Sequence, residues 1–369
     1  MNFDLTEDEE MLKALTERFV NDHYDHDSRR AAQAERPGFS GRNWEVLGEL
    51  GLIAAPFPEE LGGLGLDASG TATLFEALGR GLVVEPLAEA VMLAGRLFAA
   101  TASEGLLAEW IDPLLSGQRR LTLAHAETGS HREQAVLATT AQPCAGGFVL
   151  NGCKPYCVTG SKADGYLVSA GIAGESNETA LFLVPADAAG LRTRDWPMVD
   201  GTFATALTLD GVTVPAGNRL DGGLDAIGEI EVLAALARCA EALGIMERIF
   251  ADTLDYLKTR DQFGVALGSF QALQHRMVSQ YAVIEQSRAL INLALVSWGG
   301  EDFERSVYGA RAFIADASVA LGHEMIQFHG GMGVTEELAI GSGHKRLLML
   351  SRWPEDPLAA LDRYAGMLN

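Results

Sequence analysis

The chain has 369 residues, of which 48% are hydrophobic and 21% charged, as is usual for globular proteins. Its 28 basic and 50 acidic side chains give a net charge of −22, which argues against nucleic acid or an anionic membrane as a partner. The N-terminus has no basic start followed by an apolar run, and no apolar stretch reaches the ~18 residues that span a bilayer. Four cysteines show neither metal-site spacing nor disulfide density, so we expect reduced thiols, a cytoplasmic location and no metal site.

Residues 1–117 show a helical period. Thr6 is placed to cap the first helix, because apolar residues recur at helical spacing after it. Residues 26–43 are polar and are expected to form a loop, and the Pro- and Gly-rich segment 54–67 is expected to be a turn between helices. Further helices are predicted over residues 70–81, 84–101 and 104–116.

Residues 118–220 contain the short apolar runs that are typical of β-strands. In GFVLNGCKPYCV, residues 147–158, Asn151 and Gly152 stand between two such runs, which is the pattern of a tight β-hairpin. Later runs are separated by Gly, Asn and Asp. The segment is therefore predicted to form a small antiparallel sandwich or barrel.

The helical period returns after residue 216, and no proline occurs from Ala216 to Trp353. Long helices predicted over 270–298 and 303–328 are expected to pack as a bundle. The sequence thus predicts an α+β chain with three domains. They are a helical domain at residues 1–117, an antiparallel β domain at 118–225 and a helical bundle at 226–369.

A first candidate site lies in YLKTRDQFGVALGSFQALQHR, residues 256–276. We expect Arg260 at the end of a helix, a turn at Gln262-Phe263-Gly264, and a new helix from Gln271. A guanidinium at such a corner can clamp a phosphate, and the Phe263 ring offers a face to a second ring. The residues alone leave open the alternative of a solvated arginine in a surface turn.

A second candidate site lies in QFHGGMGVTEE, residues 327–337. Gly330 and its neighbour let backbone N–H groups approach a ligand phosphate, because no side chain intervenes. Glu336 and Glu337 follow these glycines. They are either candidates for a catalytic base or acids in the first turn of a helix capped by Thr335.

Four motifs follow one another along the chain: FPEELGGLGL, NGCKPYCVTG, RDQFGVALGSFQ, and QFHGGMG followed by an acid. In order and spacing they resemble the acyl-CoA dehydrogenase family over essentially the whole chain. The resemblance implies an N-terminal helical domain, a central β domain and a C-terminal four-helix bundle, in dimers or tetramers with FAD between subunits. It implies that a carboxylate removes the proton α to an acyl-CoA thioester while FAD takes a hydride from the β carbon, giving a 2,3-enoyl-CoA. An electron-transfer flavoprotein is the implied electron acceptor.

The resemblance also assigns roles to particular residues. The implied base is the acid at Glu337, whereas Glu336 is offset from it by ~100° around a helix and cannot face the same flavin. The family's alternative base position, on the first bundle helix, is occupied here by Ala234. The residues implied to hold the FAD of a neighbouring subunit are Arg260, Gln262, Phe263, Gln271, Gln327, Gly330 and Gly331, with Ser130 as a weaker contact.

Two departures from the family pattern concern the flavin ring. The family's TEPxAGSD segment corresponds to residues 126–131, where Ala126 replaces the threonine. Val158 stands where the family's K-x-W-I-T-N-G segment has its threonine. Neither side chain can make a hydrogen bond, and the family's C-terminal RDA…EGT segment is also absent.

This asymmetry makes the chain resemble the small, or β, subunits of heteromeric α2β2 acyl-CoA dehydrogenases, such as those acting on pimeloyl-CoA or steroid side chains. In that interpretation a homologous partner supplies the base and the flavin-ring contacts, this chain completes the FAD site, and Glu337 is structural or vestigial. The alternatives are a self-sufficient homo-oligomer with Glu337 as base, and a non-catalytic scaffold subunit. No local motif encodes the acyl group, which can come from fatty-acid, dicarboxylic or steroid side-chain β-oxidation.

Overall fold

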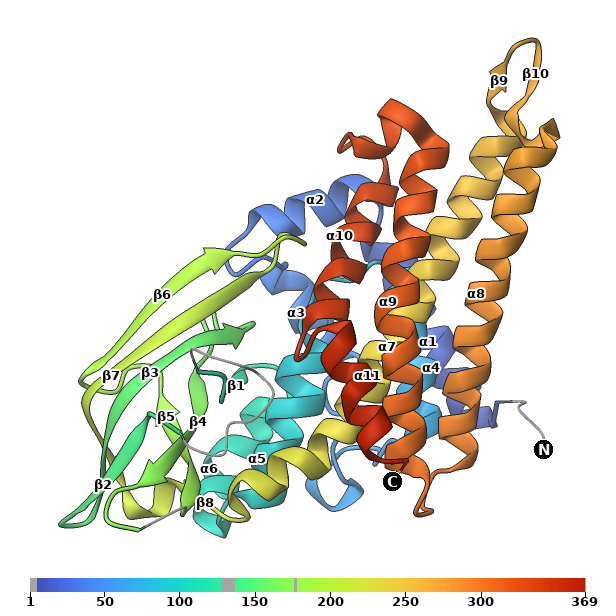
Figure 1. Cartoon of the computed structure of the whole chain (residues 1–369). Coiled ribbons are helices and arrows are strands. Elements are labelled where there is room, and N and C mark those ends of the chain that lie inside the picture. The colour runs from blue at the N-terminus through green and yellow to red at the C-terminus, as the bar shows by residue number, and fades with distance from the viewer. Residues whose placement is uncertain (1–4, 128–136, 176–177, 369) are drawn as a thin grey trace. The chain divides into compact units, whose positions relative to one another are not determined.

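The computed structural model describes residues 5–127, 137–175 and 178–368. Its residues form two compact units (Figure 1). The first, called the bundle unit, comprises Met1–Arg30, Asp67–Val83 and Ala235–Asn369. The second, called the sheet unit, comprises Ala31–Leu66 and Val84–Ala234.

The bundle unit is built from long helices. In it α9 packs against α8, α10 and α11, and α1 packs against α4. The long helices predicted over 270–298 and 303–328 are confirmed, and Thr6 and Glu9 form a reciprocal capping box at the first helix. The helices are α1 (Glu7–His23), α4 (Ala68–Arg80), most of α7 (Gly223–Thr259), α8 (Gln271–Val296), α9 (Phe303–His329), α10 (Ala339–Arg352) and α11 (Pro357–Gly366).

Two glycines let α4 and α7 come into backbone contact. A Cβ added at Gly79 would overlap the carbonyl group of Glu241, and a Cβ at Gly244 would overlap the carbonyl oxygen of Glu76. Both glycines therefore serve a close helix crossing that any larger side chain would push apart.

The loop predicted over residues 26–43 is wrong. Two short helices occupy it, α2 (His26–Ala34) and α3 (Gly41–Glu49), the second capped by Ser40. The polar composition of this segment gave no sign of α2, because the helix is stabilised by contacts with distant parts of the chain. Arg29 is buried and donates to the carbonyl oxygen of Leu82 at 2.9 Å.

The sheet unit contains one mixed sheet. Its strand order is β6-β7-β3-β2-β4-β5-β8, and β1 pairs with β4. All pairings are antiparallel except β1 with β4 and β2 with β4, so the predicted antiparallel domain is a mixed sheet. The strands are β1 (Leu121–Ala124), β2 (Thr140–Cys144), β3 (Gly147–Val158), β4 (Gly165–Ile172), β5 (Thr179–Pro185), β6 (Leu191–Pro197), β7 (Phe203–Pro215) and β8 (Arg219–Leu220).

The hairpin predicted at Asn151-Gly152 is also wrong. Both residues lie inside the single strand β3, where the pairing with β7 shifts register between Leu150 and Gly152. Gly152 is needed for a close approach, because a Cβ there would overlap Thr139. The real hairpin turn joins β2 to β3 at Gly146, whose φ is +86°.

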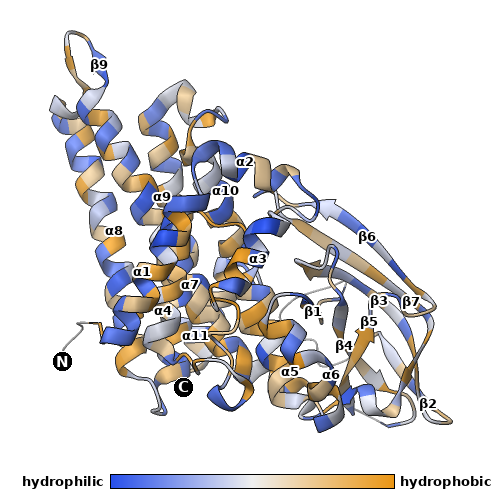
Figure 2. Cartoon of the chain, turned by 180° about the vertical axis from the view of Figure 1, so that it is seen from behind, coloured by the Kyte–Doolittle hydropathy of each residue, from blue (hydrophilic) through white to orange (hydrophobic). Residues whose placement is uncertain are grey.

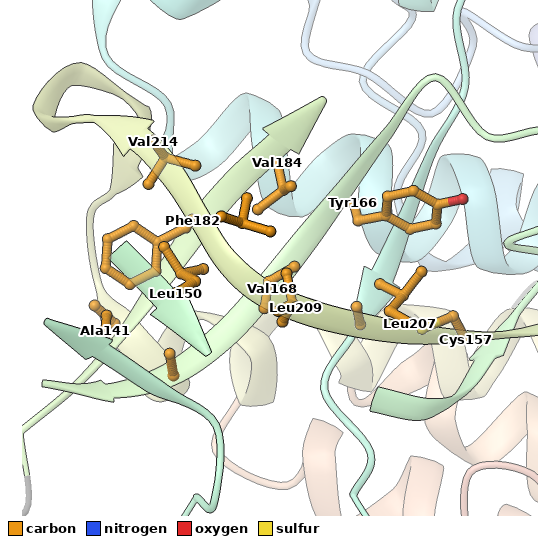
Figure 3. Close-up of a cluster of buried hydrophobic side chains, with 14 of the residues drawn as sticks. Ala141, Leu150, Cys157, Tyr166, Val168, Phe182, Val184, Leu207, Leu209 and Val214 are labelled. Atoms are coloured by element: carbon orange, nitrogen blue, oxygen red, sulfur yellow. The ribbon is translucent and has the colours of Figure 1, made fainter. Parts of the chain in front are cut away.

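Apolar side chains fill both faces of this sheet. Figure 3 shows Leu150, Phe182, Leu207 and their neighbours pointing toward one another from β3, β5 and β7. The other face packs Leu121 and further leucines of β4 and β5 against α5 (Arg96–Thr101) and α6 (Glu104–Leu115). The predicted helix 84–101 consists of α5 and a nine-residue π-helix, η2 (Leu87–Gly95), that is buried throughout.

No helix in the described ranges is both long and apolar enough to cross a membrane. Among the described residues there is likewise no group of three or more His, Cys, Asp or Glu side chains that could hold a metal ion.

Candidate cofactor site

The first predicted motif forms an exposed hairpin between α7 and α8. The helix α7 ends at Thr259, and β9 (Asp261–Gln262) then pairs with β10 (Val265–Ala266). Phe263 and Gly264 make the turn with φ of +57° and +83°, a strained conformation for phenylalanine. The Phe263 side chain is consequently held out from the protein and is 91% exposed.

The polar groups of this hairpin face solvent. Arg260 is exposed, and no described residue forms a hydrogen bond or ion pair with its guanidinium. Its backbone is fixed, because its N–H donates to the Tyr256 carbonyl and its own carbonyl accepts from the Leu267 N–H, both at 2.8 Å. Gln271, the first residue of α8, is exposed as well. A rigid backbone thus presents a free cation beside an uncovered aromatic ring.

The second predicted motif ends α9. Gln327 is exposed on the last turn, and Gly330 has φ +56° and ψ −134°, which only glycine adopts readily. A Cβ added at Gly330 or Gly331 would have nothing within 4 Å, so the backbone of this turn is open to a ligand.

One ring stack brings the two motifs together. His329 is buried and stacks on Tyr256 with a centroid separation of 4.3 Å and an interplanar angle of 26°. Its Nδ1 donates to the Met325 carbonyl at 2.9 Å, which fixes the tautomer. Tyr256 lies on the last turn of α7 and His329 directly precedes Gly330, so the stack holds the arginine corner and the glycine turn at one end of the bundle.

The two glutamates lie in a turn before α10. The helix begins at Ala339, and the Thr335 hydroxyl donates to the Met332 carbonyl at 2.9 Å, so the predicted cap at Thr335 is wrong. The helical offset between Glu336 and Glu337 therefore does not apply, because neither residue is in a helix.

Glu336 and Glu337 differ in the contacts that they make. His26 Nε2 donates to the Glu336 carbonyl oxygen at 2.7 Å, and Arg30 Nη2 lies 3.6 Å from the Glu336 carboxylate. The Glu337 side chain is exposed and has no hydrogen bond or ion pair to any described residue. Of the two acids, Glu337 is thus the one with a carboxylate available for chemistry.

Glu127, in the described part of the segment that corresponds to the first flavin-ring signature, forms a buried ion pair with Lys154. Lys154 is fully buried, and its Nζ donates to the Glu127 carboxylate at 2.6 Å, to Ser169 Oγ at 3.0 Å and to the His125 carbonyl at 3.2 Å. Glu127 also accepts the backbone N–H groups of residues 138 and 139, at 2.6 and 3.1 Å. Ser130, the weaker predicted cofactor contact, lies outside the described residues.

The pKa values of this cluster follow from its burial. Burial opposes the charged form of Glu127, but hydrogen bonds from Lys154 and from residues 138 and 139 outweigh it and lower its pKa to about 2. Burial and the Lys154 charge lower the pKa of His125 to about 4, so its ring is neutral at physiological pH. The half-buried His125 ring bonds to Ser169 Oγ at 2.8 Å.

Arg120 holds the turn that corresponds to the second flavin-ring signature. This buried guanidinium donates to the carbonyl oxygens of Thr159 and Ser161, at 2.5 and 2.6 Å. Thr122 Oγ1 donates to the Val158 carbonyl at 2.8 Å. Thr159 has φ +62°, and its hydroxyl oxygen is enclosed without a hydrogen-bond partner in the described part of the chain.

These two regions fit FAD to different degrees. The free guanidinium of Arg260, the uncovered Phe263 ring and the open glycine turn are suited to a pyrophosphate and an adenosine. In the sheet unit, Ala126 and Val158 are buried and apolar. Those side chains offer the polar edge of a flavin ring no hydrogen bond.

The sequence did not reveal the contacts that assemble the site. The His329–Tyr256 stack, the tie between Arg30 and Glu336, and the Glu127–Lys154 pair join residues far apart in the chain. Only the Glu127–Lys154 pair could have been suspected from the sequence, because an acid and a lysine in β-rich segments need charged partners if they are buried.

Comparison with known proteins gives the family. The patterns described as the N-terminal and C-terminal domains of acyl-CoA dehydrogenase match residues 6–118 and 221–353. The chain is 30% identical to the acyl-CoA dehydrogenase FadE27 of Mycobacterium tuberculosis, over 90% of each sequence. Two solved structures share the fold over nearly their whole length. The ChsE4-ChsE5 complex from Mycobacterium tuberculosis has a TM-score of 0.91 at 27% identity, covering 100% of this chain and 99% of that one. The Tcur3481-Tcur3483 steroid ACAD variant has a TM-score of 0.87 at 28% identity, covering 98% of each chain.

The predicted architecture of helical domain, central sheet and C-terminal helices is that of these proteins. The chain therefore belongs to the acyl-CoA dehydrogenase family of FAD-dependent oxidoreductases.

Proposed function

We propose that this chain is one subunit of a heteromeric acyl-CoA dehydrogenase, in which it completes the FAD site of a homologous partner. The assembly converts an acyl-CoA thioester to the 2,3-enoyl-CoA. FAD, when bound, accepts the hydride from the β carbon, and an electron-transfer flavoprotein reoxidises the assembly.

One observation carries the proposal, namely the unequal state of the two halves of the FAD site. The adenosine-binding half, built around Arg260 and Phe263, is exposed and has its polar groups free. The ring-binding half has apolar side chains at Ala126 and Val158. A chain built in this way can grip a cofactor that another subunit holds by the flavin ring.

The similar proteins support a two-component assembly. One related solved structure is the ChsE4-ChsE5 complex, and the other, Tcur3481-Tcur3483, is a steroid ACAD variant. We accordingly propose an α2β2 heterotetramer acting in steroid side-chain or fatty-acid β-oxidation.

Within this proposal each residue has a definite task. Arg260 would donate charge-assisted hydrogen bonds to the pyrophosphate, and Phe263 would offer its ring to the adenine. Gln262, Gln271 and Gln327 offer amide groups to the adenosine half. The glycine turn at 330–331 brings backbone N–H groups to the same ligand.

A visible absorption spectrum tests the assembly. The chain purified alone is expected to be colourless, and to become yellow on co-expression with a homologous subunit. A chain that binds FAD alone and is bleached by an acyl-CoA would contradict the heteromer and support a homo-oligomer.

The cofactor contact is tested by Arg260→Ala in the co-expressed assembly. Loss of a charge-assisted contact worth ~1.5–3 kcal/mol should weaken FAD binding by about 10- to 150-fold. Lys258→Ala is the matched control, since it removes an exposed cation from the same helix end. Unchanged FAD affinity of the Arg260 variant would favour a scaffold that does not touch the cofactor.

A self-sufficient enzyme remains the second candidate, because the Glu337 carboxylate is unpaired while Glu336 is tied to Arg30. The α-proton of a thioester requires a carboxylate whose pKa is raised by desolvation, which a second subunit covering Glu337 can provide. Under the heteromeric proposal, Glu337→Gln should keep turnover within about threefold, as should the control Glu336→Gln. A loss of at least ~1,000-fold in kcat with FAD retained would instead identify Glu337 as the base.

A further inference from the structure

A hollow lies within the bundle unit between α1, α4 and α8, which Figure 2 shows side by side. Its volume is about 520 Å³, which is within the range of small-molecule sites. One of its walls is a face of α8, since the lining residues of that helix recur at helical spacing. They are Arg288, Ile291, Asn292, Leu295 and Val296. Val296 is 39% exposed, so the hollow opens to solvent at this point.

A closed ring of ion pairs forms one end of the hollow. Arg80 of α4 pairs with Glu76 of the same helix and with Glu247 of α7. Arg288 of α8 pairs with the same two acids. Arg80 Nε donates to Glu247 at 2.6 Å, and Arg288 Nη1 donates to Glu76 at 3.3 Å. No side chain of the ring is more than 35% exposed, so partners from three helices hold the two guanidinium groups in place.

Cations outnumber acids on the surface of the hollow. Lys13, Arg80 and Arg288 line it, and Glu76 is the one acid among its described lining residues. The Lys13 ammonium lies 4.0 Å from the carboxylate of Glu17, at the limit of an ion pair. A chain with a net charge of −22 thus presents a locally positive hollow, which favours an anionic ligand.

Hydrogen-bond donors are also left over at the ring. A guanidinium carries five N–H donors, and Arg80 Nη1 and Arg288 Nε form no hydrogen bond with a described residue. Thr73 adds a hydroxyl and Asn292 an amide to the same lining. These groups can bind the oxygen atoms of a carboxylate without breaking the ring.

The other end of the hollow is apolar. Leu243 and Ile291 are buried in its lining, and Leu295 and Val296 continue the wall along α8. Leu295 and Val296 follow Arg288 by seven and eight residues, so they lie ~10–12 Å from the charged ring along the helix. A ligand that fills the hollow therefore needs a charged head group and an apolar chain of about that length.

We propose that the hollow binds a carboxylate with an apolar chain, of the class of a medium-chain fatty acid. Its head group lies among Lys13, Arg80 and Arg288, and its chain runs along α8 to the apolar end. Counted with their ion-pair partners, these cations and the acids around them are equal in number. A singly charged carboxylate therefore suits the site better than a doubly charged phosphate.

The hollow is separate from the proposed cofactor contacts. Arg288 lies 17 residues after Gln271, the first residue of α8, which places it ~26 Å further along the helix. The inference therefore goes beyond the proposed function and does not rest on it.

Isothermal titration calorimetry with sodium octanoate tests the site, in the chain alone and in the co-expressed assembly. Octanoate should bind at one site per chain in both samples. Octanol has the same apolar chain without the charge, and acetate has the charge without the chain. Each should bind at least ~10-fold more weakly than octanoate, because octanol loses the charge-assisted hydrogen bonds and acetate loses the apolar contact.

Two variants with matched controls test the lining. Lys13→Met removes the charge and keeps most of the side chain, so it should weaken octanoate binding by about 10-fold or more. Its control, Arg18→Met, removes an exposed cation of the same helix outside the hollow and should leave binding unchanged. Val296→Trp fills the open end and should abolish binding, whereas Leu293→Trp, exposed on α8 outside the hollow, should not. Circular dichroism and Tm should be unchanged in all four variants.

The proposal would be overturned by an absence of saturable octanoate binding below ~10 mM, or by binding to the chain alone that is lost in the assembly. Equal affinities of Lys13→Met and Arg18→Met for octanoate, or of the chain for octanoate and octanol, would overturn it as well. Arg260→Ala should lower the affinity for FAD without changing that for octanoate. Octanoate binding that depends on Arg260 would therefore also contradict the proposal.

Discussion

Replacing Glu127 with Gln should cost the sheet unit much of its stability, and the cost should depend on pH. The carboxylate accepts a hydrogen bond from the fully buried Lys154 and from two backbone N–H groups, at residues 138 and 139. The substitution leaves the lysine charge buried with neutral acceptors only, which typically costs ~3–5 kcal/mol.

The lowered pKa of Glu127 sets how this loss of stability depends on pH. It falls from an ordinary value of 4.5 to about 2 in the folded chain. The lowered value means that the carboxylate stabilises the fold at pH above 4.5 and loses this effect as the pH falls toward 2. The difference is worth roughly 3 kcal/mol at pH 7 and less than half of that at pH 3.

Urea denaturation of Glu127→Gln, Lys154→Met and the double variant at pH 7 and pH 3 measures this coupling. The double variant should lose less than the sum of the two single losses, because it leaves no unpaired charge. Arg192→Met is the control, since its pair with Asp210 is exposed and worth at most ~1 kcal/mol. A Glu127→Gln loss below ~1 kcal/mol at pH 7, or one that does not shrink at pH 3, would refute the reasoning.

Two further predictions concern the bundle unit. Gly244→Ala should destabilise the chain by at least ~2 kcal/mol, because its Cβ would overlap the Glu76 carbonyl oxygen. Gly228→Ala is the control on the same helix, since its Cβ would have open space and the change should be neutral or stabilising. Equal Tm values for the two variants would contradict the close helix crossing. Burial and the nearby His323 charge lower the pKa of His344 from its ordinary 6.5 to about 4. Protonation of His344 in the unfolded chain should therefore reduce the free energy of unfolding by about 2 kcal/mol between pH 7 and pH 5. His344→Gln should remove that part of the decline in urea midpoint, and an unchanged decline would show that the ring is not held neutral.

Much of the bundle unit could be predicted because its signals are local. The Thr6–Glu9 capping box and the long apolar periods of α8 and α9 all lie within a few turns of helix. The corner at Arg260 and the turn at Gly330 followed from residue types whose backbone preferences are strong.

The sheet unit was harder because long-range pairing overrides local turn preference. Asn151-Gly152 has the best hairpin composition in the chain, yet β7 pairs with β3 on both sides of it, and Thr139 demands a glycine there. The pair therefore forms a register shift within a strand. The single register that buries both apolar faces cannot be read from one segment of sequence.

The candidate site shows the same division. The motif residues were identifiable one by one, but the contact that distinguishes the two glutamates comes from His26 and Arg30, some three hundred positions earlier. No spacing rule links residues at that separation.

Buried hydrogen bonds and an ion pair stabilise the parts of the sheet unit that surround Ala126 and Val158. Arg120 still fixes the carbonyl oxygens of the 159–161 turn, and Glu127 still joins residues 138 and 139 to Lys154. The side chains of Ala126 and Val158 are apolar and buried, so neither needs a hydrogen-bond partner. These buried contacts are internal to the sheet unit and stabilise this part of it by themselves. In the proposed heteromeric assembly such internal contacts would let the sheet unit fold before the partner subunit binds.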